Sequence, residues 1–246
     1  MARSLEQEKY RTMLTRLLFL WDYLRFKKLS KSVGRTLTAG LRDLYPCLKD
    51  KTLTTGFDRH YIYHPAWAAR VLSETKPIEH VDISSSLAFC TLVSAFVPIS
   101  FFDYRPAELQ LSGLSSKSAD LLSLPFEDRS ISSLSCMHVV EHVGLGRYGD
   151  RLDPEGDLKA IEQLTRVLAI GGSLLFVVPI GKPRIQFNAH RIYSYEQILS
   201  YFSELDLMEF SLIPDSPKDG GLIRNAPVEL ANLQSYACGC FWFIRR

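Results

Sequence analysis

The residues best suited to chemistry lie between positions 138 and 142, where the sequence is His-Val-Val-Glu-His. On a helix, His138 and His142 would share one face, with the carboxylate of Glu141 beside them. The H-x-x-E-H pattern occurs in inverted zinc peptidases, where the two histidines bind zinc and the glutamate acts as the base. A third ligand far downstream would still be needed, so the motif alone does not predict a zinc site.

Two loops further along carry more polar groups. The segment Gly144–Gly149 spells G-x-G-x-x-G, but a dinucleotide fingerprint must join the first strand to its helix, and this segment follows a later strand. We expect a mobile loop at the rim of a site instead. The polar residues of this loop and of the later FNAHR loop are candidates for contact with a substrate: Arg147, Tyr148, Asp150, Asn188 and Arg191.

A scaffold must position these residues, and from about residue 66 short apolar runs alternate with helical segments. This alternation is typical of a mostly parallel sheet covered by helices on both faces. The expected strands are 80–83, 99–103, 120–122, 131–136, 173–178, 207–213 and 236–244. The expected helices are 66–73, 87–96, a segment containing Val139 and Val140, 154–168 and 195–202.

Two features refine this prediction. Gly171 and Gly172 are expected to end the helix at 154–168, because glycine is favoured just beyond a helix C-terminus. The last two strands are joined by a loop that contains proline and glycine rather than by a helix. They are therefore predicted to form an antiparallel pair at one edge of the sheet, beside five parallel strands.

In open α/β sheets, ligands bind beyond the carboxyl ends of the strands. The segment HVDISSS is a strand that ends in Asp82 and continues into a turn of small residues, which lets backbone N–H groups approach a cofactor. Asp103 lies 21 residues after Asp82, the separation at which an acid meets a ribose. The candidate cofactor-binding residues at these strand ends are Asp82, Ser84, Ser86, Asp103, Asp120, Leu121 and Met137.

Two longer stretches resemble the middle of class I S-adenosylmethionine-dependent methyltransferases: ADLLSLPFEDRSISSLSCMHVVEHV and AIEQLTRVLAIGGSLLFVVPIG. The matching positions are Asp120, Leu124, Pro125, Phe126, Asp128, His142, Arg166, Leu168, Gly171 and Gly172. More narrowly, DRHYIYHPAWAAR, HVDISSS, HVVEHVGLGRYGD and FNAHRIYS resemble the methyltransferase-like family DUF268. That likeness would cover nearly the whole chain after residue 50.

The resemblance implies a Rossmann-like three-layer sandwich with a mostly parallel sheet, to which the residue patterns add the antiparallel edge hairpin and an N-terminal helical extension. It implies S-adenosyl-L-methionine as cofactor at the strand-end residues named above. The expected reaction is methylation of an oxygen on a small or sugar-like acceptor, in which a neutral imidazole takes the hydroxyl proton. The candidate catalytic residues are His138, Glu141, His142 and His190. Because the resemblance explains residues 138–142 without a metal, none is expected.

The first loop departs from the usual acid-x-Gly-x-Gly-x-Gly pattern, because Asp82 is followed by Ser84, Ser86 and Ala88. Serine is small but adopts positive φ less freely than glycine. A second interpretation follows from this departure. In it the chain is a catalytically inactive binding or scaffold protein that keeps the methyltransferase fold with a degenerate cofactor loop.

Composition sets further bounds. The 29 basic and 27 acidic residues give a net charge of +2, so no global field favours nucleic acid. Five cysteines without a CxxC pair favour a reducing compartment, and Cys136, Cys238 and Cys240 lie among apolar residues typical of a core. We expect a cytoplasmic protein, because the longest N-terminal apolar stretch, LLFLW, is too short to span a bilayer.

The N-terminal region differs from the rest. Leucines and a tryptophan recur at helical spacing among basic residues, which predicts an amphipathic helix. Packing on the main domain, dimerisation through this helix and peripheral membrane contact are the alternatives for it. The expected organisation is a helical extension over residues 1–50 and a methyltransferase-like domain over residues 51–246.

Overall fold

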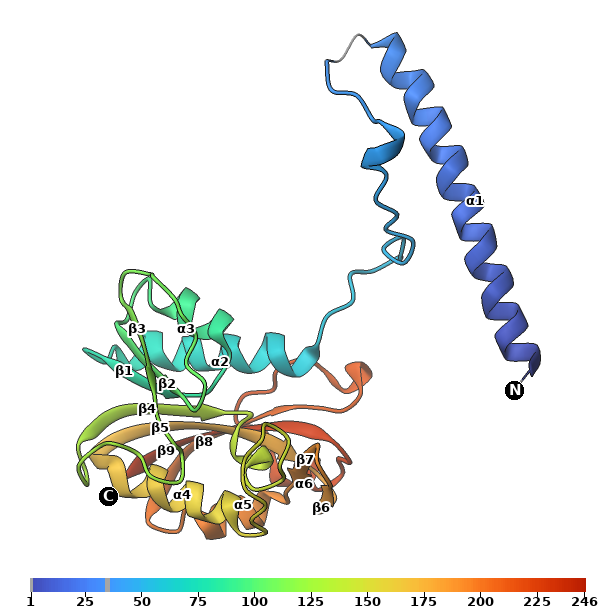
Figure 1. The fold of residues 1–246 in the computed structure, drawn as a ribbon. Helices are drawn as coiled ribbons and strands as arrows, with labels where there is room; N and C mark the ends of the chain where they lie inside the picture. Colours follow the sequence, from blue (N-terminus) through green and yellow to red (C-terminus); the bar gives the residue numbers. More distant parts are fainter. Residues whose placement is uncertain (1, 34–35) are drawn as a thin grey trace. The chain divides into compact units, whose positions relative to one another are not determined.

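The computed structural model describes residues 2–33 and 36–246, with side chains from residue 12 onward. The chain divides into two compact units, residues 1–56 and 57–246 (Figure 1). The first unit contains α1 (Ala2–Ser32) and a short 3-10 helix, η1 (Leu41–Asp43). Leu17, Trp21 and Leu24 on α1 are exposed. None of the helices in the described residues has the length and apolarity needed to cross a membrane.

The second unit is built around a seven-stranded sheet with strand order β3-β2-β1-β4-β5-β9-β8. The strands are β1 (His80–Ile83), β2 (Ile99–Asp103), β3 (Leu114–Ser118), β4 (Ile131–Met137), β5 (Leu168–Ile180), β8 (Leu205–Ile213) and β9 (Ala237–Arg245). The first five are parallel to one another, and β9 runs antiparallel to both β5 and β8. The predicted sheet of five parallel strands and an edge hairpin is confirmed.

Helices cover both faces of the sheet, as Figure 1 shows. One face carries α2 (Arg59–Thr75) and α3 (Leu87–Val93), which bury an apolar cluster that includes Trp67, Phe89 and Val93. The other face carries α4 (Gly156–Val167), α5 (Tyr195–Tyr201) and α6 (Val228–Asn232) over a second cluster. Two short strands, β6 (Arg184–Gln186) and β7 (His190–Ile192), pair separately. Two more 3-10 helices, η2 (Val140–His142) and η3 (Pro217–Asp219), lie in loops.

Helix α2 begins earlier than predicted. The expected start at residue 66 lies just after Pro65, which cannot donate a backbone hydrogen bond inside a helix. In the structure the helix continues through Pro65, and Asp58 caps it by accepting a hydrogen bond from the backbone N–H of Tyr61 at 3.1 Å. The extra turns carry His60 and Tyr61 toward the candidate site.

Two other predictions for single elements are wrong. The third strand is residues 114–118 rather than 120–122. Its sequence, LSSKS, is only partly buried at the sheet edge, so it lacks the apolar run by which the other strands were predicted. Gly171 and Gly172 do not cap α4, since Leu168 already begins β5 in extended conformation. The two glycines fall where the pairing of β4 with β5 shifts register, between Ile131 and Ser133.

Candidate active site

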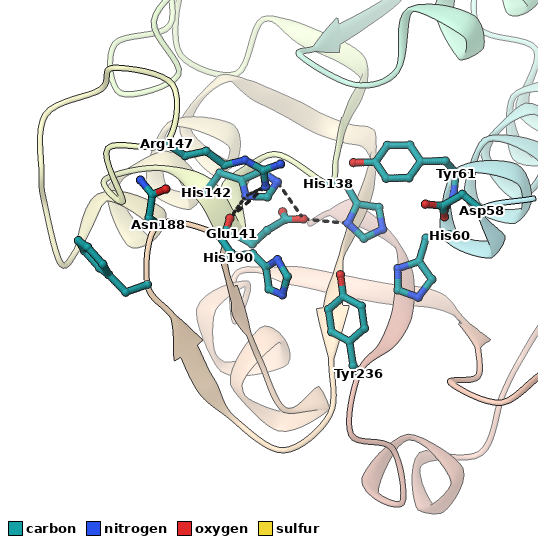
Figure 2. A pocket seen from close by; sticks show the side chains of 12 residues that line it. Asp58, His60, Tyr61, His138, Glu141, His142, Arg147, Asn188, His190 and Tyr236 are labelled. Atoms are coloured by element: carbon teal, nitrogen blue, oxygen red, sulfur yellow. Dashed lines mark hydrogen bonds and ion pairs between the residues drawn. The ribbon is translucent and has the colours of Figure 1, made fainter. Parts of the chain in front are cut away.

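Two cavities adjoin at the carboxyl ends of the parallel strands. The strand-end cavity has a volume of about 410 Å³ and lies beyond β1, β2 and β4. The histidine cavity has a volume of about 560 Å³ and is lined by six of the predicted residues together with residues from the start of α2 (Figure 2). His138 and His142 line both cavities. Molecules bound in the two cavities would therefore both lie beside His138 and His142.

The strand-end cavity brings together four of the predicted cofactor-binding residues: Ser84, Asp103, Asp120 and Leu121. Asp103 is the last residue of β2, and its Oδ1 accepts a hydrogen bond from the backbone N–H of Arg105 at 2.7 Å. Asp120 is exposed, and its Oδ1 accepts from the N–H of Leu122 at 2.9 Å. In both carboxylates Oδ2 has no hydrogen bond within the described residues, so each can still accept one from a ligand.

The serine turn keeps the backbone conformation that glycine usually provides. Ser84 has φ +56°, in the left-handed region, and its N–H donates to the carbonyl of Phe102 at 2.8 Å. A non-glycine residue pays about 1–2 kcal/mol for this conformation. Serine at this position therefore makes the turn conformation less favourable than glycine would. The turn nevertheless keeps this conformation and lines the cavity.

Asp82 lies below this turn rather than in the cavity. It is fully buried, and its carboxylate accepts hydrogen bonds from the N–H of Ser85 at 3.0 Å and from the hydroxyl of Ser135 on β4. Burial raises the pKa of Asp82 to about 6. The hydroxyl of Ser85 in turn accepts from the N–H of Met137 at 3.0 Å. These contacts hold the serine turn against the end of β4.

Asp82, Ser86 and Met137, which the sequence predicted as cofactor-binding residues, do not line either cavity. Ser86 is the residue before the first turn of α3, and Met137 is a buried core residue. Asp82 and the backbone N–H of Met137 support the turn from behind through their hydrogen bonds to Ser85.

In the histidine cavity, His138 and Glu141 form a buried pair. Nδ1 of His138 donates to Oε1 of Glu141 at 2.8 Å, and Nε2 lies 3.3 Å from Sγ of Cys238. Burial is the largest single influence and would raise the pKa of Glu141, but the hydrogen bond from His138, the electrostatic effect of His138 and His142 and a backbone hydrogen bond together outweigh it, so the pKa is lowered. His138 has φ +57°, so its backbone is held in a strained conformation at the end of β4.

These two residues do not form the helical H-x-x-E-H arrangement. The 3-10 helix η2 contains only Val140–His142, and His138 precedes it in a left-handed conformation. His138 and His142 therefore do not occupy positions i and i+4 of one helix. The zinc-peptidase interpretation of this motif is wrong.

Within the described residues, one ring nitrogen of His142 forms a hydrogen bond to a backbone carbonyl and the other, Nε2, has no hydrogen-bond partner. Nδ1 donates to the carbonyl oxygen of Ala189 at 2.6 Å, which leaves the lone pair on Nε2. Oε1 of Glu141 lies 3.8 Å from Nε2, which is beyond hydrogen-bond distance. Burial lowers the pKa of His142, so the ring is neutral at pH 7.

His190 and Asn188 also line the histidine cavity. The ring of His190 stacks on that of Tyr236 with centroids 5.0 Å apart, and burial lowers the pKa of His190. Its Nε2 is buried without a hydrogen-bond partner in the described part of the chain. Asn188 has φ +63°, and its Nδ2 donates to the carbonyl of Leu145 at 3.4 Å.

The loop at 144–149 is organised by one carboxylate. Asp150 accepts hydrogen bonds from the backbone N–H groups of Gly144 at 2.8 Å and of Gly146 and Tyr148 at 3.2 Å. Arg147 lines the histidine cavity, while Tyr148 and Asp150 line the strand-end cavity. The loop thus separates the two cavities at their rim.

Arg191 lies elsewhere. Its side chain is almost fully buried, its guanidinium donates to the carbonyls of Val143, Asp153 and Pro154, and it lies 3.4 Å from Asp157. It lines neither cavity. The structure therefore assigns Arg191 to the support of the loop between η2 and α4.

Several cavity residues were not predicted from the sequence. They are Asp58, His60 and Tyr61 at the start of α2, and Tyr236 before β9. His60 stacks on His138 with ring centroids 5.4 Å apart, and Tyr61 stacks on the same ring at 5.5 Å. The Asp58 helix cap three residues before Tyr61 is the sequence signal by which this helix start could have been found.

The comparisons with known proteins agree with this architecture. Residues 127–212, about a third of the chain, match the family model described as "Caenorhabditis protein of unknown function, DUF268". The predicted resemblance to DUF268 is confirmed over this part, which is shorter than expected. A search among curated proteins gave no match.

Solved structures share the fold. A protein described as a sarcosine dimethylglycine methyltransferase, from Galdieria sulphuraria, is 14% identical over 73% of this chain and 83% of its own, with a TM-score of 0.51. The methyltransferase in complex with the Trm112 activator of Haloferax volcanii is 16% identical over 76% of this chain and 90% of its own, with a TM-score of 0.50. At these identities the likeness is one of fold, and the fold is that of class I methyltransferases.

Proposed function

We propose that this chain transfers a methyl group from S-adenosylmethionine to a hydroxyl oxygen of a small or sugar-like acceptor. The observation that carries the proposal is the junction of the two cavities at His142. A nucleoside-type ligand fits the strand-end side, an acceptor fits the histidine side, and an imidazole with a free nitrogen stands between them. Such an arrangement places two reactants and a base in one small volume, which supplies much of a reaction rate by proximity.

The residues of the strand-end cavity suit the cofactor. Asp103 has a carboxylate oxygen open to ribose hydroxyls, Asp120 has one open to an adenine amino group, and Leu121 offers an apolar surface to a base. The volume of about 410 Å³ lies within the range of small-molecule sites. When bound, S-adenosylmethionine supplies an electrophilic methyl group on a sulfonium centre.

His142 is the best placed general base. Its Nδ1 proton is fixed on the carbonyl of Ala189, so Nε2 can accept a proton from an acceptor hydroxyl. Its lowered pKa keeps the ring neutral at pH 7, the state that a base requires. His138 is less suited, because Glu141 and Cys238 occupy both of its nitrogens.

The lining of the histidine cavity favours a polyhydroxylated acceptor. Tyr61 and Tyr236 offer ring surfaces, while Asp58, Arg147 and Asn188 offer donors and acceptors at the rim. Aromatic surface combined with a few polar groups is the usual composition of a small-molecule site that fixes orientation. His190, whose Nε2 has no partner among the described residues, is placed to bind a hydroxyl of the acceptor.

The test begins with calorimetric titration of the full chain with S-adenosylhomocysteine. Asp103→Ala is expected to weaken binding by about 10- to 150-fold, the value of one charged hydrogen bond of about 1.5–3 kcal/mol. Asp219→Ala, an exposed aspartate on η3, is the matched control and should bind as the wild type does. Absence of binding heat with the folded wild type would refute the enzyme proposal and favour the scaffold interpretation.

A second test addresses the base. His142→Gln is expected to lower methyl transfer by about 10²–10⁴-fold in a screen of hydroxylated acceptors, the usual contribution of a general base. Its affinity for S-adenosylhomocysteine should change far less than its turnover. An equal loss in affinity and turnover would assign His142 to cofactor binding instead.

A further inference from the structure

Three side chains from distant parts of the sequence converge beside the histidine cavity: His60 on the first turn of α2, His138 at the end of β4 and Cys238 on β9. One ligand atom of each lies within 4.8 Å of the ligand atoms of the other two. We propose that these three residues bind a divalent transition metal, with zinc as the expected ion. This site does not depend on the proposed methyl transfer.

The distance between the ligand atoms of His138 and Cys238 suits such an ion, and the ligand atom of His60 lies within 4.8 Å of both. With Zn–N bonds of about 2.0–2.1 Å and a Zn–S bond of about 2.3 Å, a tetrahedral site separates a nitrogen from a sulfur ligand by about 3.6 Å. Nε2 of His138 lies 3.3 Å from Sγ of Cys238, so this pair needs only a small adjustment. Imidazole and thiolate are also the ligand types that zinc prefers over hard cations such as magnesium.

Glu141 orients the central ligand. Because its carboxylate accepts the Nδ1 proton of His138, the lone pair of Nε2 points at Cys238. A carboxylate behind a metal-binding histidine is the common way in which proteins fix the tautomer of the ring and raise its basicity. The side chain of Glu141 is only 1% exposed, and its other oxygen, Oε2, has no partner within the described residues. A nearby cation would compensate this buried negative charge.

The surroundings of the three ligands contain a second unpaired atom. His64 is fully buried, and its ring lies 5.0 Å from that of His138, between centroids. Its Nδ1 donates to the carbonyl of His60 at 2.7 Å, so the lone pair is on Nε2, which has no partner in the described part of the chain. Buried polar groups without a partner are uncommon in folded proteins. A water bound to the metal would supply a donor to this nitrogen.

Three protein ligands leave a fourth position open, as in catalytic rather than structural zinc sites. His60 and His138 both line the histidine cavity, so we expect the open position to face this cavity. It can take water or a hydroxyl oxygen. Zinc binds a thiolate rather than a thiol, so metal binding is expected to release the proton of Cys238.

The experiment uses the full chain, stripped of metal with a chelator and titrated with Co²⁺. One equivalent is expected to produce a thiolate-to-cobalt charge-transfer band in the near ultraviolet, and added Zn²⁺ should remove it. Cys238→Ser should abolish the band, while Cys136→Ser, which removes an equally buried thiol on β4, should retain it. The zinc content of the purified protein, measured by mass spectrometry, should approach one ion per chain.

Two other variants test the proposal if Cys238→Ser fails to fold. His60→Gln changes a half-buried residue and should weaken cobalt binding while the band persists at saturation. Glu141→Gln should lower the affinity by about 10–100-fold, the usual effect of losing a carboxylate behind a histidine ligand. No cobalt band with a wild type that is folded by circular dichroism, or a band that survives Cys238→Ser, would overturn the proposal. Binding of S-adenosylhomocysteine, measured by calorimetry, tests the proposed function independently of the metal site.

Discussion

Replacement of Asp82 by asparagine should make the protein more stable at neutral pH, and the gain should grow with pH. The carboxyl group is fully buried, and its pKa rises from 3.8 to about 6 because burial disfavours the charged form. The group therefore contributes stability that is fully present below pH 3.8 and is lost as the pH rises through 6. Above pH 7 the free energy of unfolding is therefore about 3 kcal/mol lower than it would be with Asp82 protonated in both the folded and the unfolded state.

Asparagine has nearly the same shape and carries no charge. Its side-chain oxygen can accept from the N–H of Ser85, and its amide can donate to the hydroxyl of Ser135. At pH 5 about 1.4 kcal/mol of the stabilisation that protonated Asp82 provides is still present, and at pH 7.5 almost none of it remains. The difference in unfolding free energy between Asp82→Asn and the wild type should thus rise by about 1.4 kcal/mol over this range.

Urea unfolding followed by tryptophan fluorescence at pH 5 and pH 7.5 measures this difference. Asp128→Asn is the control. The side chain of Asp128 is 73% exposed, so removal of its charge should change the free energy of unfolding equally at both pH values. If the difference for Asp82→Asn were constant or fell with pH, Asp82 would already be ionised in the folded protein at pH 5, and its pKa would not be raised. The account of the buried support beneath the serine turn would then be wrong.

Three further predictions, with four substitutions, test the fold. Ser84→Gly should bind S-adenosylhomocysteine no more weakly than the wild type in calorimetry, because glycine adopts the left-handed turn without strain; weaker binding would show that the serine side chain is needed. Arg224→Met should lower the urea unfolding free energy by about 3 kcal/mol, since it leaves the buried carboxylate of Glu209 without its cation. Gly144→Ala should lower the melting temperature more than Gly149→Ala, because both have positive φ but only at Gly144 does a Cβ meet a backbone carbonyl; equal shifts would contradict this.

The sequence was sufficient for most of the sheet. Residues 80–83 and 99–103 were predicted with the bounds that the structure shows, because each is a short apolar run that ends in a polar turn. Their carboxyl ends place Ser84 and Asp103 at one cavity, as the general rule for such sheets requires. The edge strand β3 was missed because partial exposure removes the apolar signal.

The histidine cavity was only half predictable. His142 and His190 follow strands, so the topology alone brought them to one edge. His60 lies far earlier in the sequence, on a helix whose start is obscured by Pro65. Cys238 was assigned to the core, which is correct for its burial, but no spacing rule connects it to His138, 100 residues before it.

The position of β9 determines the order in which the site can be completed. β9 follows β8 in the chain, yet it lies between β5 and β8 in the sheet. β8 therefore cannot join the sheet until β9 has been synthesised and has paired with β5 on one side and β8 on the other. Cys238 and Tyr236 arrive with that insertion, so a nascent chain that has already formed β1, β2 and β4 still lacks one wall of the histidine cavity. We therefore expect binding at this wall to begin only after β9 has paired with β5.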